Sequence, residues 1–194
     1  GKVTDHGVSL QLENIVWAGR QLWAPDCAYK NGRYYLYFPA RDKNDIFKIG
    51  VAVSNTPEGP FVPEKNPIIG SYSIDPAVFK DSDEKFYMLL GGISGGQLQR
   101  YRKNKMLDCS TEPGAGEAAL CPKIARMSDT MLEFGEELRD VQILDENGEP
   151  LKASDTERRF FEGAWMHNYK GVYYLSYSTG STHKICYATG SSPY

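Results

Sequence analysis

The stretch Glu162-Gly-Ala-Trp-Met-His-Asn-Tyr-Lys-Gly-Val-Tyr173-Tyr174-Leu-Ser-Tyr177 joins a short strand to a second strand built on two adjacent tyrosines. A Lys-Gly turn separates the two strands, and this combination is a hairpin signature. Residues 23–38 and 75–90 repeat the design, with an aromatic pair at the corresponding place in each. Three copies of one hairpin predict an all-β repeat protein.

Alignment of the aromatic pairs places Trp23, Asp75 and Glu162 at one equivalent position, the start of each hairpin. The first interval is 52 residues (75 − 23), close to one four-stranded propeller blade, and the second is 87 (162 − 75). An insertion at about 97–134 accounts for the longer interval. In a β-propeller the innermost strands line a central channel, so the three positions should meet around it. The alternative is a β-sandwich in which they only cap strands.

The repeats divide the chain into the tail of a preceding blade (1–20), a blade (21–70), a blade with the insertion (71–160) and the start of a further blade (161–194). We therefore expect an interior piece of one propeller domain. Such a piece leaves sheet edges uncovered, so it should associate with the missing blades of the same protein or form an oligomer.

Composition excludes several functions. The net charge of −3 gives no positive excess for nucleic acid. No apolar run approaches the roughly 18 residues of a membrane span, and residues 1–20 show no signal peptide. The glycine-rich run 91–96 lacks the ending or the helix that a phosphate site needs, so we expect a turn at the channel mouth.

Cysteine and histidine spacing predicts no metal site. The four cysteines form no CxxC pair, and the three histidines, at 6, 167 and 183, have no ligand spacing. Cys109 and Cys121 bracket a polar loop, so a disulfide between them is conceivable in an oxidising compartment.

Two carboxyl groups at channel-facing positions, Asp75 and Glu162, suggest acid and base chemistry. Glu162 lies beside apolar groups, and lost hydration favours the protonated form that a general acid needs. Glycoside hydrolysis uses one carboxylic acid at the leaving oxygen and a second carboxylate for water. Trp23, Phe161 and Trp165 could provide aromatic platforms for sugar rings. The alternative is that Glu162 is an exposed strand-end residue.

Three motifs carry a family resemblance. They are Trp23-Ala-Pro-Asp26, Ser73-Ile-Asp75-Pro-Ala-Val-Phe79 and Phe161-Glu162-Gly163-Ala164-Trp165. In order and spacing they resemble the second, third and fourth blades of glycoside hydrolase family 43. The resemblance implies a five-bladed β-propeller of an inverting β-xylosidase, α-L-arabinofuranosidase or arabinanase, which acts on carbohydrates containing xylose or arabinose.

The resemblance also implies roles for single residues. Glu162 matches the general acid, and Asp75 matches the aspartate that orients this acid and keeps it protonated. Trp23 matches an aromatic residue of the sugar subsite. Thr182 lies about where the family contacts substrate after the acid blade.

The chain departs from the family pattern in two places. The general base should be an aspartate of the first blade, and Asp5 lies in the wrong context to supply it. The fifth blade, whose histidine helps hold an ion or water, is not represented. We expect no cofactor, although a channel-bound calcium ion is conceivable in the full-length protein, and we expect this piece alone to be inactive.

Two other functions fit the same features. One is a propeller that binds carbohydrate without cleaving it, and the other is an interaction propeller whose aromatic repeat is only core. The compartment stays open, with a periplasmic or secreted location favoured.

Overall fold

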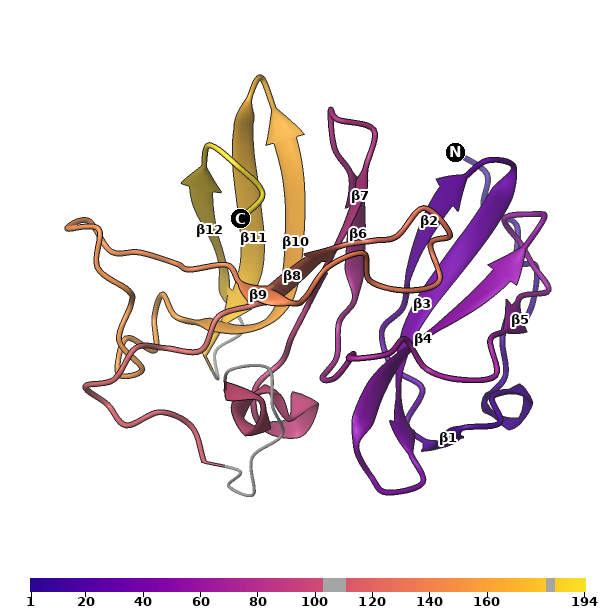
Figure 1. The fold of residues 1–194 in the computed structure, drawn as a ribbon, viewed down its shortest axis with the longest axis horizontal. Helices are drawn as coiled ribbons and strands as arrows, with labels where there is room; N and C mark the ends of the chain where they lie inside the picture. The colour runs from indigo at the N-terminus through magenta and orange to yellow at the C-terminus, as the bar shows by residue number, and fades with distance from the viewer. Residues whose placement is uncertain (103–110, 181–183) are drawn as a thin grey trace.

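Three antiparallel sheets stand side by side in chain order in the computed structural model (Figure 1). The structure describes residues 1–102, 111–180 and 184–194. The first sheet contains β1 (Ala18–Arg20), β2 (Asp26–Lys30), β3 (Arg33–Asp42), β4 (Phe47–Ser54) and β5 (Val62–Pro63). The second contains β6 (Ala77–Lys80), β7 (Phe86–Leu90), β8 (Lys123–Arg126) and β9 (Arg139–Asp140), and the third contains β10 (Phe160–Tyr169), β11 (Val172–Thr179) and β12 (Lys184–Gly190).

The three predicted hairpins are confirmed as β2–β3, β6–β7 and β10–β11. Cross-strand aromatic contacts support the first two: the rings of Tyr29 and Tyr34 lie 4.8 Å apart, and those of Phe79 and Tyr87 lie 5.5 Å apart. Such cross-strand pairs stabilise a sheet. The repeated aromatic pair in the sequence therefore marks the second strand of each hairpin.

The helical elements with described bounds are three single turns: η1 (Leu12–Asn14), η2 (Ser94–Gly96) and η3 (Leu98–Arg100). No helix of these ranges is long and apolar enough to cross a membrane. The all-β prediction is confirmed.

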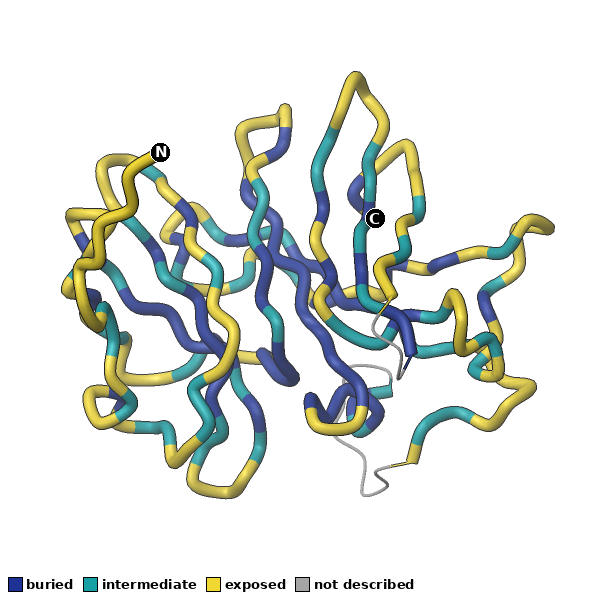
Figure 2. Tube along the Cα trace, turned by 180° about the vertical axis from the view of Figure 1, so that it is seen from behind, coloured by how far each residue is buried: buried dark blue, intermediate teal, exposed yellow. Residues whose placement is uncertain are grey.

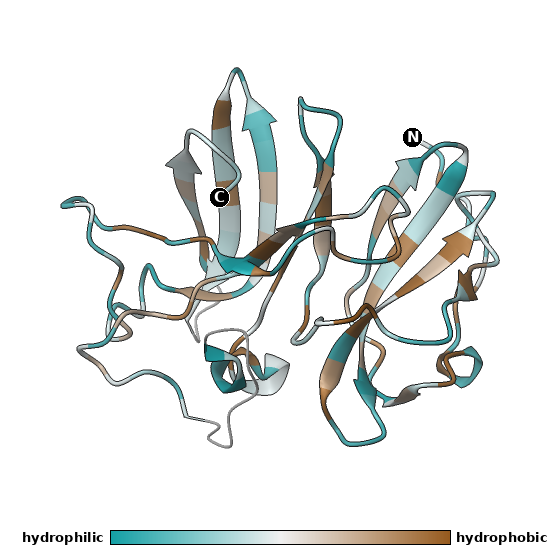
Figure 3. Cartoon of the chain, in the orientation of Figure 1, coloured by the Kyte–Doolittle hydropathy of each residue, from teal (hydrophilic) through white to brown (hydrophobic). Residues whose placement is uncertain are grey.

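One hydrophobic core runs through all three sheets. All five residues of β7 are buried, because the second sheet is packed on both of its faces (Figure 2). In Figure 3 the central strands β7 and β8 carry apolar residues. Tyr37 and Ile49 contribute to this core from the first sheet, and Phe160 and Met166 contribute from the third.

Two sequence boundaries differ from the structure. Strand β8 lies inside the predicted insertion at about 97–134 and pairs with β7 as the third strand of the second sheet. Short strands with charged residues at both ends carry little sequence signal. At the other end, β1 pairs with β3, so the first sheet begins within the segment 1–20.

The cysteine prediction falls partly outside the described residues, because they do not include Cys109. Cys121 carries a free, buried thiol, whose Sγ lies 3.7 Å from the carbonyl oxygen of Ala119. Burial raises the pKa of this thiol to about 11, so it is protonated and unreactive at neutral pH.

Candidate active site

Asp75 and the Glu162-Gly163 segment lie together, as the sequence predicts. Asp75 stands just before β6, and its Oδ2 accepts a hydrogen bond from the backbone N–H of Gly163 at 3.0 Å. Its backbone has a φ of +53°, a left-handed conformation that aspartate tolerates better than most residues. This turn directs the side chain from the second sheet toward the third.

The electrostatics of Asp75 reflect this position. Burial and, secondly, the Glu162 carboxylate raise its pKa to about 6, and the Gly163 hydrogen bond opposes both. Two interacting carboxyl groups titrate as a pair rather than as independent acids. Asp75 therefore titrates well above the usual range of an aspartate, beside the Glu162 carboxyl group.

Backbone contacts hold Glu162 against the loop that follows β7. Gly92 forms an isolated β-bridge with Glu162, and the N–H of Ile93 donates to the carbonyl oxygen of Phe161 at 2.9 Å. A Cβ atom at Gly92 would lie 2.6 Å from the Ile74 side chain, so a larger residue there would have to displace that side chain. The glycine-rich run 91–96 thus packs against the strand of the candidate acid.

Ser73 fastens this loop, although sequence reasoning did not select it. Its buried hydroxyl accepts from the N–H of Gly92 at 2.9 Å and donates to the carbonyl oxygen of Gly96 at 2.7 Å. The only sequence signal was its place in the Ser73-Ile-Asp75 motif.

Trp23 borders the same loop. The backbone N–H of Trp23 donates to the carbonyl oxygen of Pro39 at 3.0 Å. The centroid of its ring lies 4.7 Å from that of Phe47. The Arg41 guanidinium covers the Phe47 ring at 4.8 Å. A Cβ atom at Gly95 would lie 3.8 Å from Trp23 Cη2. The indole is therefore held from one side while 37% of the residue stays exposed, as a sugar platform requires.

The other predicted platforms have different surroundings. Phe161 is partly buried and packs against the core. Trp165 is 51% exposed and lies 5.1 Å from the His167 ring, which stacks on Tyr174 at 5.1 Å. These rings form an aromatic row on the third sheet, on the face opposite the buried Ala164. The role of Trp165 as a substrate contact stays a prediction, and Thr182 lies outside the described residues.

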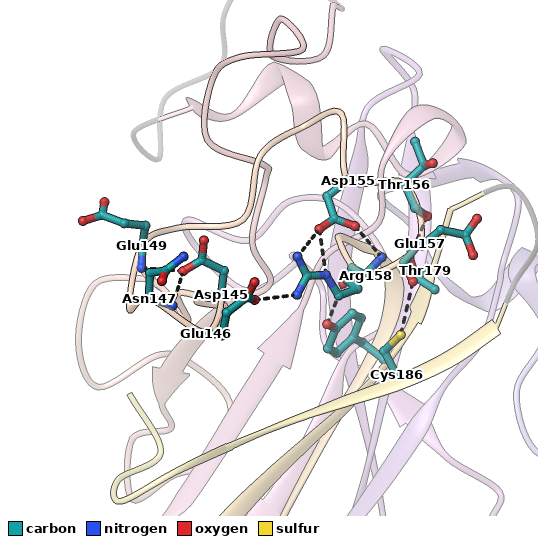
Figure 4. Close-up of polar contacts among 11 residues, drawn as sticks. Asp145, Glu146, Asn147, Glu149, Asp155, Thr156, Glu157, Arg158, Thr179 and Cys186 are labelled. Carbon is teal, nitrogen blue, oxygen red and sulfur yellow. Dashed lines mark hydrogen bonds and ion pairs between the residues drawn. The ribbon is translucent and has the colours of Figure 1, made fainter.

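The segment that enters β10 is fastened by polar contacts (Figure 4). Arg158 pairs with Asp155 at 2.7 Å and with Glu146 at 3.0 Å. The Tyr177 hydroxyl of β11 donates to the Arg158 carbonyl oxygen at 2.6 Å. Single exposed ion pairs contribute little to stability. Here one guanidinium makes both ion pairs, and the backbone carbonyl of the same residue accepts the hydrogen bond from the sheet. The start of β10, which carries Glu162, is fixed in this way.

Metal ligation finds no support in residues 1–102, 111–180 and 184–194, where no three His, Cys, Asp or Glu side chains could hold an ion. A channel-bound calcium ion in the full-length protein stays a prediction.

Comparison with known proteins identifies a glycosidase family. The sequence model of Glycosyl hydrolases family 43 matches residues 3–194. A protein named Xylosidase/arabinosidase from Bacteroides ovatus is 60% identical over 194 residues, which is 100% of this chain and 60% of that protein. A protein named Beta-xylosidase from Xylanibacter ruminicola is 53% identical, over 98% of this chain and 59% of that protein.

Solved structures agree. RS223-Beta-xylosidase superposes with a TM-score of 0.97 at 62% identity, over 100% of this chain and 60% of that one. A GH43 beta-xylosidase/alpha-arabinofuranosidase from a compost microbial metagenome, solved with xylotriose, gives a TM-score of 0.97 at 61% identity and the same coverage. The chain spans about 60% of the length of these relatives. The prediction of a partial β-propeller is confirmed, and the chain belongs to glycosyl hydrolase family 43.

Proposed function

We propose that the complete protein is an inverting glycoside hydrolase, a β-xylosidase or α-L-arabinofuranosidase, for plant polysaccharides or oligosaccharides that contain xylose or arabinose. One observation carries the proposal: the Asp75 carboxylate of the second sheet lies against the Glu162-Gly163 segment of the third sheet in a family 43 fold. The names of the relatives support the class of sugar.

Glu162 is the proposed general acid. In its protonated form it gives its proton to the leaving glycosidic oxygen as the bond breaks. Asp75 is a positioning residue for this acid. The Gly163 N–H stabilises the ionised form of Asp75, and this role requires that negative charge beside Glu162. Trp23 presents its exposed face to the sugar.

The general base stays a prediction. An inverting enzyme needs a carboxylate roughly 6.5–9.5 Å from the acid, with water between them. Asp5 is exposed, and its Oδ1 accepts the N–H of Gly7 at 2.8 Å in a local turn. These contacts support the exclusion of Asp5 from this role.

The decisive experiment incubates the complete protein with xylotriose and with nitrophenyl β-xyloside and α-L-arabinofuranoside. Proton NMR during the first minutes should show the inverted anomer of the released sugar. Retention of configuration would contradict the inverting mechanism. Binding without product would instead support the carbohydrate-binding propeller, and neither binding nor product would support the interaction propeller.

The role of Asp75 has its own test. In Asp75→Asn the negative charge beside Glu162 is lost, so Glu162 gives up its proton more easily. The alkaline limb of the kcat/KM profile on xylotriose should move to lower pH. An unchanged profile would contradict this role.

A further inference from the structure

Asp26 joins the first two blades at the channel edge. It lies at the start of β2, and its Oδ2 accepts a hydrogen bond from the backbone N–H of Val78 in β6 at 2.6 Å. Strand β6 pairs only with β7 in the described sheet, so its other edge presents unpaired backbone groups. Such groups need partners when they are removed from water. The Asp26 carboxylate supplies one.

The same kind of contact recurs at the next blade. The Asp75 carboxylate accepts from the N–H of Gly163 in β10 at 3.0 Å. In both cases a carboxylate of one blade holds an amide of the innermost strand of the next blade. Hydrogen bonds to an ionised acceptor are shorter and stronger than neutral ones. Two contacts of this kind therefore connect β2 to β6 and β6 to β10 in series.

The sequence positions of these contacts show what they align. Asp26 follows Trp23 by three residues, and Val78 follows Asp75 by three residues. The hydrogen bond between Asp26 and Val78 thus holds equivalent positions of two repeats beside each other. The second contact then fixes Asp75 against the residue that follows Glu162.

We propose that Asp26 is a positioning residue of the active site. Its hydrogen bond fixes how far β6 lies along β2, and so places Asp75 correctly between Trp23 and Glu162. The inference rests on the proposed function, because it assigns Asp26 a part in the same reaction. Without this contact β6 can slide along β2, and the Gly163 hydrogen bond to Asp75 lengthens. The Trp23 ring and the Asp75–Glu162 carboxyl pair are then no longer placed to contact the same bound sugar.

A purely structural contact between blades provides the matched control. The Tyr173 hydroxyl donates to Asp81 Oδ2 at 2.6 Å and also joins the second sheet to the third. Asp81 follows the end of β6 and Tyr173 lies near the start of β11, so this contact lies at the turn end of both hairpins. Tyr173→Phe removes a hydrogen bond between blades without touching the channel edge.

The experiment compares Asp26→Ala, Asp26→Asn and Tyr173→Phe in the complete protein. Misplacement of a bound substrate by about 1 Å can cost about 100-fold in rate, so Asp26→Ala should lose roughly 10- to 100-fold in kcat/KM on xylotriose. Its alkaline pH limb should move to lower pH, because a weaker Gly163 contact leaves Asp75 less ionised. Asp26→Asn keeps an oxygen acceptor and should recover most of the activity and the original limb. Tyr173→Phe should keep the wild-type profile.

Amide hydrogen exchange supplies a readout that does not depend on catalysis. The Val78 and Gly163 amides should exchange faster in Asp26→Ala than in wild type, and should be unchanged in Tyr173→Phe. The proposal would be overturned if the Val78 and Gly163 amides of Asp26→Ala exchanged no faster than in wild type. It would also be overturned if the alkaline pH limb of Asp26→Ala were unchanged. If Asp26→Ala does not fold, Asp26→Ser replaces it with the same expectations. If the wild type cleaves no glycoside, the proposed function fails while exchange still tests the contact.

Discussion

The Asp75 carboxylate accepts the Gly163 amide hydrogen at 3.0 Å although the two residues lie 88 positions apart in the chain. This single contact joins the second sheet to the third and lies one residue from Glu162. It also explains why two effects oppose each other at Asp75: burial and Glu162 raise its pKa, and the amide lowers it. The charge state of the carboxyl pair therefore depends on where this amide lies.

Gly163→Ala should disturb the carboxyl pair through the backbone alone. Gly163 has a φ of +66°, and a Cβ atom there would have no heavy atom within 4 Å. The cost is therefore conformational, about 1–2 kcal/mol of unfolding free energy, and relaxation of φ would turn the N–H away from Asp75. We expect lower stability in urea unfolding together with a shifted pH profile of kcat/KM.

Gly171→Ala is the control for this substitution. Gly171 has a φ of +82° and equal open space, but it lies in the turn at the far end of the β10–β11 hairpin. It should cost a similar unfolding free energy and leave the pH profile unchanged. Equal pH profiles in the two variants would contradict a specific role for the Gly163 amide.

Asp75→Asn should stabilise the complete protein at neutral pH. The pKa of Asp75 is raised from 3.8 to about 6, so the folded state binds its proton more tightly than the unfolded state. The resulting stability is fully present below pH 3.8 and is lost as pH rises through about 6. The ionised form thus destabilises the fold above pH 6, by roughly 1–3 kcal/mol.

Urea unfolding at several pH values measures this effect. The difference in unfolding free energy between Asp75→Asn and wild type should be small at pH 4 and should grow toward pH 8. Because both proteins share every other titrating group, their difference reports Asp75 together with its coupling to Glu162. A difference that is constant with pH would show that Asp75 carries no raised pKa.

Trp23→Ala should weaken sugar binding. The indole is held by Phe47 and keeps an exposed face, so its loss removes a stacking surface worth about 1–3 kcal/mol by analogy with aromatic stacking on planar ligands. We expect kcat/KM on xylotriose to fall about 10- to 100-fold, mainly through KM. Trp23→Phe should retain part of the activity. Tyr29→Ala, which removes another exposed aromatic residue, is the matched control and should leave KM unchanged.

Much of the fold could be read from the sequence because the repeat is strong. The aromatic pairs mark the second strand of each hairpin, and their alignment places Asp75 and Glu162 at equivalent positions. Residue types alone do not show which atoms meet. The contact between Asp75 and Gly163 depends on a left-handed φ at both residues, and no pattern of residue types predicts that pairing.

Other features of the structure were not predicted from the sequence, for physical reasons. Strand β8 went unrecognised because Lys123–Arg126 is short and charged at both ends, and its place in the sheet comes from packing on β7. Ser73 and Asp26 act through backbone groups of distant segments, which sequence spacing does not reveal.

The central claim is that Glu162 is the general acid, and the most direct measurement compares two leaving groups in Glu162→Gln. A sugar leaving group needs a proton, whereas nitrophenolate leaves without one. Loss of a general acid typically costs about 10²–10⁴-fold. We therefore expect kcat on xylotriose to fall at least about 100-fold and kcat on nitrophenyl β-xyloside to fall far less, with Glu157→Gln active on both. An equal loss on both substrates, or full activity on xylotriose, would contradict the assignment of Glu162.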